Sequence, residues 1–289
     1  MITHLSRTAY ACFVGALAAA VAALALSACG EETVAVPYAS PAGAPRVSDA
    51  ALEQFVFRAY VDLVGTAPTA EQLAARTADL RAGGAAPETR AALVDDLQTG
   101  PDYDSAYALN LYQGAKAHFL ENFPDAEIER AFVGLGGPDD DARLRALLAW
   151  PDDYLAGAAD LRDLQRAAVY NLVYDRINMG SFNLVRATFD NLLWRFPTDA
   201  EFAAGFEMVE RGEERELFGF SGSGKADYVD IVVRSEEALE GIVIWQYELL
   251  LARRPTAAET LAHLDALRAS GDVTALQRAL MQSDEYARL

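Results

Sequence analysis

The sequence predicts an all-α fold built from about four similar helical units. Apolar residues recur at helical spacing between residues 48 and 289, and no segment alternates with a two-residue period for long enough to predict a strand. A helix-ending cassette also recurs, centred on a proline that is followed by a residue able to cap the next helix. The corner prolines are Pro68, Pro124, Pro197 and Pro255.

The cassette is clearest at residues 245–259, where an apolar helical face runs into Pro255. A residue before proline is pushed out of the α region, so we expect the first helix to end near Arg254. The Thr256 hydroxyl can then accept from the amide of Glu259, whose carboxylate can reach back to the Thr256 amide. The cassette therefore predicts a helix, a tight corner and a second helix with a capping box.

Three further copies keep this order of residues. Two have a threonine cap and a partner three residues later: Thr69 with Gln72, and Thr198 with Glu201. The weaker copy has Asp125 as the cap and Ile128 where the capping partner is expected. The second and third corners are further apart than the others, which predicts an extra helix between them. We expect one all-α domain over 48–289, with units at about 48–105, 106–157, 181–238 and 239–289 and the extra helix at 158–180.

The first 28 residues are predicted to lie outside the fold, as a signal peptide. A nearly unbroken apolar run from Ala11 to Leu26 ends in Leu-Ser-Ala-Cys at 26–29. This resembles the bacterial lipoprotein signal, which implies cleavage before Cys29 and lipidation of that cysteine. A transmembrane anchor is the alternative, but a run of about 16 residues is short for a span. Residues 29–47 are then the lipidated cysteine and a flexible Pro/Ala-rich tether.

The lipoprotein resemblance also implies a location. The protein would be held in the cell envelope through its N-terminal lipid, and Gly30, in place of an aspartate after the cysteine, favours the outer membrane by analogy with the enterobacterial sorting rule. Cys12 leaves with the signal peptide, so no disulfide, cysteine-ligated metal or thiol nucleophile is expected. The missing Cys-x-x-Cys-His pattern likewise excludes covalent haem.

The charge balance argues against nucleic-acid binding. The chain has 24 basic and 43 acidic residues, a formal net charge of −19, and phosphate backbones repel such a surface. Solubility of an envelope protein explains this charge more simply than a basic partner does.

Two segments suggest ligand chemistry but have simpler interpretations. The sequence Ser-Gly-Ser-Gly-Lys at residues 221–225 is similar to a phosphate-binding loop. That motif needs a preceding strand and a Ser or Thr after the lysine, whereas no strand is predicted here and Ala226 follows Lys225. A flexible surface loop is therefore favoured. The acidic residues 139–141 and 152–153 lack the spacing of a calcium loop. Acids at a helix N-terminus are already stabilised by the helix dipole, and whether this region binds a cation stays open.

We assign no catalytic, cofactor-binding or metal-ligating residue. His118 and His263 have no metal-site spacing, and capping or the helix dipole accounts for Glu71, Glu201 and Glu259. The Glu-Ser dipeptide typical of lytic transglycosylases is absent. The arginines before the corners are expected to cap the carbonyls that end the first helix, and three recurring tyrosines to pack between units with their hydroxyls at the rim. These residues are Arg195, Arg253 and Arg254, and Tyr103, Tyr154 and Tyr286.

Residues 57–71, followed by 93–97 and 101–103, look like the helical domain of unknown function found beside cytochrome-like domains in planctomycete-type surface proteins. The repeated Tyr-x-x-Leu-Leu-x-Arg-x-Pro-Thr form is also similar to helical repeats of surface-layer and phycobilisome-linker type proteins. Neither family supplies a catalytic residue. We therefore expect a lipid-anchored envelope protein with a non-catalytic scaffold, assembly or partner-binding role. The alternative is an envelope enzyme acting on cell-wall polymer through unidentified carboxylates.

Overall fold

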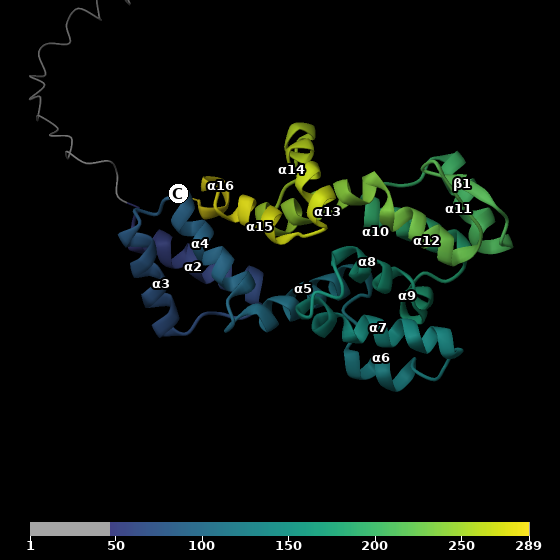
Figure 1. The fold of residues 1–289 in the computed structure, drawn as a ribbon, viewed down its shortest axis with the longest axis horizontal. Helices are drawn as coiled ribbons and strands as arrows, with labels where there is room; N and C mark the ends of the chain where they lie inside the picture. The colour runs from purple at the N-terminus through teal and green to yellow at the C-terminus, as the bar shows by residue number, and fades with distance from the viewer. Residues whose placement is uncertain (1–46, 289) are drawn as a thin grey trace, which may run out of the picture. The chain divides into compact units, whose positions relative to one another are not determined.

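Residues 47–288 are described by the computed structural model, and they form fifteen helices and one short hairpin (Figure 1). The all-α class predicted from the sequence is confirmed. The signal peptide, Cys29 and all of the tether except Val47 lie outside the described residues.

The first corner joins α2 (Asp49–Val64) to α3 (Ala70–Ala82), and α4 (Pro87–Thr99) follows. The second joins α5 (Asp104–Phe119) to α6 (Asp125–Ala131), followed by α7 (Pro138–Leu155). The third joins α10 (Ser181–Leu193) to α11 (Asp199–Arg211), followed by β1 (Arg215–Leu217), β2 (Phe220–Gly222) and α12 (Gly224–Arg234). The fourth joins α13 (Glu236–Leu251) to α14 (Ala257–Ser270), followed by α15 (Thr274–Met281) and α16 (Asp284–Ala287).

The extra segment is two short helices, α8 (Leu161–Val169) and α9 (Leu172–Ile177), where the sequence predicted one. Asn171 causes the break. Its side-chain amide donates to the carbonyls of Ala167 and Ala168 at the end of α8, and its oxygen accepts from the first amides of α9. One buried asparagine thus ends one helix and begins the next, because asparagine can both donate and accept.

The segment predicted as a flexible loop is ordered into a hairpin and a helix start, so that prediction is wrong. β1 and β2 pair antiparallel, with Leu217 opposite Phe220. The two residues between them, Phe218 and Gly219, both have positive φ, 53° and 80°. This backbone matches the right-handed twist of a tight hairpin. Lys225 then lies in the first turn of α12, where it forms an ion pair with Asp175 of α9.

The units do not stack as an open array in which the two ends stay apart. α5 packs on α2 and α4, α8 packs on α5 and α7, and α12 packs on α8. α10 packs on α13, and α15 returns to α4. The fourth unit is therefore in contact with the first.

Tyr286 of α16 secures this closure. Its hydroxyl donates to the carboxylate of Asp62 on α2 at 2.8 Å, and its ring meets that of Phe55 edge-on at 5.8 Å. The guanidinium of Arg58 lies 4.0 Å above the same ring and donates to the Tyr286 carbonyl. A second link joins the buried Arg90 to Asp284 at 2.7 Å.

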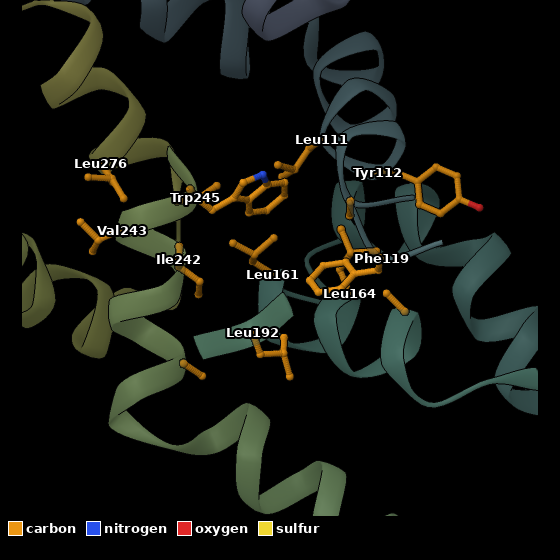
Figure 2. Packing of buried hydrophobic residues seen from close by; sticks show 14 of the residues in the cluster. Leu111, Tyr112, Phe119, Leu161, Leu164, Leu192, Ile242, Val243, Trp245 and Leu276 are labelled. Carbon is orange, nitrogen blue, oxygen red and sulfur yellow. The ribbon is translucent and has the colours of Figure 1, made fainter. Parts of the chain in front are cut away.

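Helix α13 contributes many side chains to the core. Figure 2 shows side chains from α5, α8, α10, α13 and α15 in one buried cluster. On its path α13 passes so close to the end of α10 that a Cβ built on Gly241 would lie 1.8 Å from the Leu192 carbonyl oxygen. Only glycine permits this crossing.

We expect Gly241→Ala to destabilise the protein by roughly 3 kcal/mol, because the added methyl group meets backbone and one of the two helices must move. Gly114→Ala is the matched control. The nearest atom to its built Cβ is 3.9 Å away, on Trp245, and alanine is the better helix former by about 0.5–1 kcal/mol. Urea unfolding followed by circular dichroism measures both, and equal stability of the two variants would contradict the close crossing.

Candidate functional site

The three threonine corners carry complete capping boxes. The threonine hydroxyl accepts from the amide three residues on, at 3.2–3.3 Å, and that residue's side chain accepts from the threonine amide, at 2.7–2.8 Å. The pairs are Thr69 with Gln72, Thr198 with Glu201, and Thr256 with Glu259.

The second corner differs, and the prediction that Asp125 caps its helix is wrong. Pro124 holds the cap position, while Asp125 is the first residue of α6. Its carboxylate turns away from the helix end, where it accepts from the Tyr112 hydroxyl at 2.8 Å and pairs with the ammonium of Lys116. The Lys116 side chain is only 2% exposed, and a buried cation needs a paired anion. The Asp125 carboxylate therefore pairs with Lys116 instead of capping the helix.

The arginines before the corners also act differently from the prediction. Arg195 and Arg253 bind the capping glutamates through two nitrogens each, at 2.6–3.0 Å. Each donates to only one corner carbonyl, that of the next residue. A charge-assisted bidentate pair is stronger than a bond to a neutral carbonyl. Arg254 pairs instead with Glu248 at 3.4 Å.

Each of the two corner arginines also forms an ion pair with a glutamate of a later helix. Arg195 pairs with Glu237 of α13, and Arg253 pairs with Glu285 of α16. Arg195 lowers the pKa of Glu201 to about 2, and Arg253 does the same for Glu259, with the threonine amides assisting. Both carboxylates are therefore ionised at neutral pH and held in structural contacts.

All four corners share a feature that the sequence analysis missed. The third residue before each proline has positive φ, between 49° and 75°, and these residues are Gly65, Glu121, Trp194 and Ala252. Glycine occupies this position in only one of the four corners. Because the four residues are of different types, the positive φ could not be recognised from the sequence. A built Cβ on Gly65 would lie 2.6 Å from the side-chain oxygen of Asn110, which explains glycine in the first copy.

The three recurring tyrosines have different roles. Inside the first unit, the Tyr103 hydroxyl forms hydrogen bonds with the Tyr60 hydroxyl (2.9 Å) and with the side-chain nitrogen of Gln72 (3.1 Å). Inside the second unit, the ring of Tyr154 stacks on that of Trp150, with ring centroids 4.8 Å apart. Tyr286 does join two units, but its hydroxyl is buried and not at the rim. The prediction of one shared role is therefore wrong.

The histidines and the acidic segment have structural partners. His118 stacks between Trp194 and Trp245, with ring centroids 5.3 and 5.8 Å away, and its Nε2 lies 2.9 Å from the Asn191 carbonyl. Burial lowers its pKa, so the ring is neutral at pH 7. His263 lies 3.3 Å from the Tyr247 hydroxyl.

The carboxylates of Asp140 and Asp141 accept from the amides of Gly137 and Gly134, which ties the loop before α7 to its first turn. Within residues 47–288, no three acidic, histidine or cysteine side chains come together as metal ligands.

A small groove opens where the first and last units meet on α5. This junction groove has a volume of 150 Å³ and is formed by α2, α5, α13 and α15. Its lining residues are Val61, Asp62, Tyr107, Asn110, Leu111, Gly114, Trp245, Leu249 and Gln277.

The buried amide of Gln277 in the groove lining is held by a network of hydrogen bonds. The oxygen of Gln277 accepts from the Tyr107 hydroxyl at 2.7 Å and from Gln98 at 3.0 Å, while its nitrogen donates to Gln246 at 2.9 Å. The side-chain nitrogen of Gln246 has no partner among the described residues. These bonds orient Gln277 rigidly, because three helices hold its one amide.

Apolar side chains at the groove remain exposed. Val61 and Leu249 line it and are 40% and 51% exposed, and Phe57, one turn before Val61 on α2, is 48% exposed. Asp62 is the one carboxylate in the lining. Burial raises its pKa, while the bonds from Tyr286 and Arg58 oppose that rise.

The corner ion pairs predict an acid-sensitive fold. Because the folded-state pKa values of Glu201 and Glu259 lie near 2, below the usual 4.5, their contribution to stability is complete above about pH 4.5 and is lost as the pH falls toward 2. We expect the double variant Glu201→Gln/Glu259→Gln to show a smaller loss of melting temperature between pH 5 and pH 2 than the wild type. Glutamine keeps the capping box, as Gln72 does.

Glu71→Gln is the control, since Glu71 forms no ion pair within residues 47–288. It removes one acidic side chain at the first corner and should leave the pH profile of the melting temperature unchanged. An unaltered profile in the double variant would contradict the role of the corner pairs.

Comparison of the chain with protein-family models, with curated proteins and with solved structures found no match.

Proposed function

We propose that the protein is a lipid-anchored envelope protein with a non-catalytic role in scaffolding, assembly or partner binding, and that the junction groove is its docking site. The observation that carries this proposal is a small groove whose lining includes the exposed apolar side chains of Val61 and Leu249, with the exposed Phe57 one turn before Val61 on α2. Binding energy in protein interfaces concentrates where one side chain fills such a pocket and near-neutral contacts exclude water around it.

The groove favours one kind of occupant. Its volume of 150 Å³ suits a single protruding aromatic or aliphatic side chain, which Leu111, Trp245 and Leu249 would surround. The carboxylate of Asp62 in the lining favours lysine or arginine beside that anchor. The partner is therefore an envelope protein that presents an apolar anchor residue flanked by basic residues.

The carboxylates support a non-catalytic role. Hydrolysis of a glycosidic polymer uses two carboxyl groups, of which one is held protonated, whereas Asp62 is the single carboxylate of the junction groove. Another pocket holds Asp153 and Asp163 beside two arginines, and a cation nearby favours the ionised form of a carboxyl group. The glutamates of the corners have lowered pKa values and are bound to arginine. A general acid needs the opposite shift.

The envelope location rests on the Leu-Ser-Ala-Cys sequence at 26–29. A cysteine that carries more than one lipid chain anchors a protein stably in a membrane, because each buried methylene contributes about 0.8 kcal/mol to the free energy of membrane binding. None of the helices within residues 47–288 is long and apolar enough to cross a bilayer. The similarity of the first corner to the planctomycete-type helical domain agrees with a surface role and remains part of the proposal.

Photocrosslinking in the native envelope tests the docking site. Benzoylphenylalanine replaces Phe57 or Leu249 at the groove, and replaces Leu261, an apolar side chain of α14 that is 66% exposed, as the control. We expect one partner to crosslink from both groove positions and not from 261, and Val61→Glu to abolish that product by placing a charge on the apolar wall. The crosslinked peptide should carry an apolar residue beside lysine or arginine.

Equal crosslinking from position 261, or no product from the groove, would contradict the docking site. Hydrolysis of purified cell-wall polymer by the protein would overturn the non-catalytic role.

The lipid anchor has its own test. Cys29→Ala removes the acceptor of the lipid, so we expect the variant to leave the membrane fraction or to accumulate uncleaved. Metabolic labelling with a palmitate analogue should mark the wild type and not the variant. A variant that is cleaved normally and retained in the membrane to the same extent would refute lipid anchoring at this cysteine.

A further inference from the structure

A second cleft lies between α7 and α8, away from the junction groove. It encloses 240 Å³, and its charged and aromatic lining consists of Arg143, Trp150, Asp153, Asp163, Arg166 and Tyr170. The rest of the lining is alanine, which leaves the space between the charged groups open. Two cations and two carboxylates therefore face one small volume in a chain that is strongly acidic as a whole.

The cations are held in place and keep spare donors. Arg143 and Arg166 lie 4.4 and 5.3 Å from the Tyr170 ring, and each is tied to one aspartate outside the cleft lining. Arg166 uses its Nε for that pair and Arg143 one terminal nitrogen. The Nε of Arg143 is buried without a partner among the described residues. A bound carboxylate can receive hydrogen bonds from the remaining terminal nitrogens of the two arginines without displacing an ion pair.

The carboxylates also keep spare acceptors. Asp163 accepts the Asp160 amide with one oxygen at 3.0 Å, which fixes its position at the start of α8. Asp153 makes no hydrogen bond or ion pair through its side chain within residues 47–288. An ammonium group in the cleft would find acceptors on both.

We propose that this cleft binds a small zwitterion, a free α-amino acid, with its carboxylate on Arg143 and Arg166 and its ammonium on Asp153 and Asp163. A polyanion such as a nucleotide would face two aspartates there, and a metal cation or polyamine would face two guanidinium groups. A ligand that carries both charges can satisfy all four groups.

Isothermal titration of the full-length lipidated protein in detergent tests the site with matched probes. Alanine carries both charges, N-acetylalanine lacks the ammonium, and alaninamide lacks the carboxylate. We expect alanine to bind with a dissociation constant of about 1 mM or tighter, and each analogue at least about tenfold more weakly. Equal binding of N-acetylalanine, or no binding of alanine, would overturn the proposal.

Variants separate the cleft from nonspecific effects. Asp153→Asn is expected to weaken alanine binding about tenfold without affecting the fold, because Asp153 has no other partner among the described residues. Arg166→Gln should do the same through the carboxylate end. Arg145→Gln removes the same charge from an exposed position of α7 outside the cleft lining, and should bind as the wild type does. A loss in Arg145→Gln as large as that in Arg166→Gln would contradict the proposal, because binding would then depend on positive charge in general and not on this cleft.

Discussion

The crossing of α13 over the end of α10 is the constraint on which the rest of the fold depends. Gly241 allows the two backbones to touch, and side chains of α13 share a buried cluster with those of α5 and α8 (Figure 2). The edge-to-face contact of Phe119 and Trp245, with centroids 6.5 Å apart, belongs to the same junction. Because α13 contributes to several interfaces at once, a shift at Gly241 would be transmitted through a close-packed core that has little space to absorb it.

The corners convert a short sequence into a fixed change of chain direction. A positive φ turns the chain out of the first helix, the proline prevents its continuation, and the capping residue begins the second helix. In the third and fourth corners an arginine binds the capping glutamate and a glutamate of a later helix. The same ionic contacts thus set the local turn and the position of the later helix, and the hydrogen bonds from the arginines lower the pKa of Glu201 and Glu259.

Both proposed sites are consequences of how the units meet. The junction groove exists because α16 returns to α2, where Tyr286 holds Asp62 and Arg58. The cleft exists because α8 and α9 are separated at Asn171, which leaves Tyr170 at the break with cations from α7, α8 and α12 around it. Neither site uses the threonine and glutamate residues that recur most visibly in the sequence, because those side chains are occupied in capping.

The amino-acid sequence by itself determined the features that depend on neighbours a few residues apart. The helical class, the corner prolines and the three capping boxes follow from local backbone and hydrogen-bonding rules, so they could be predicted. Asp125 could not, because a buried lysine nine residues earlier in the chain competes for its carboxylate.

Only the tertiary structure decided the positive φ at Trp194 and Ala252, the ion pairs of Arg195 and Arg253 with later helices, and the contact of the last unit with the first. These depend on groups brought together by packing, and no local pattern in one sequence encodes which distant surface an apolar face will cover.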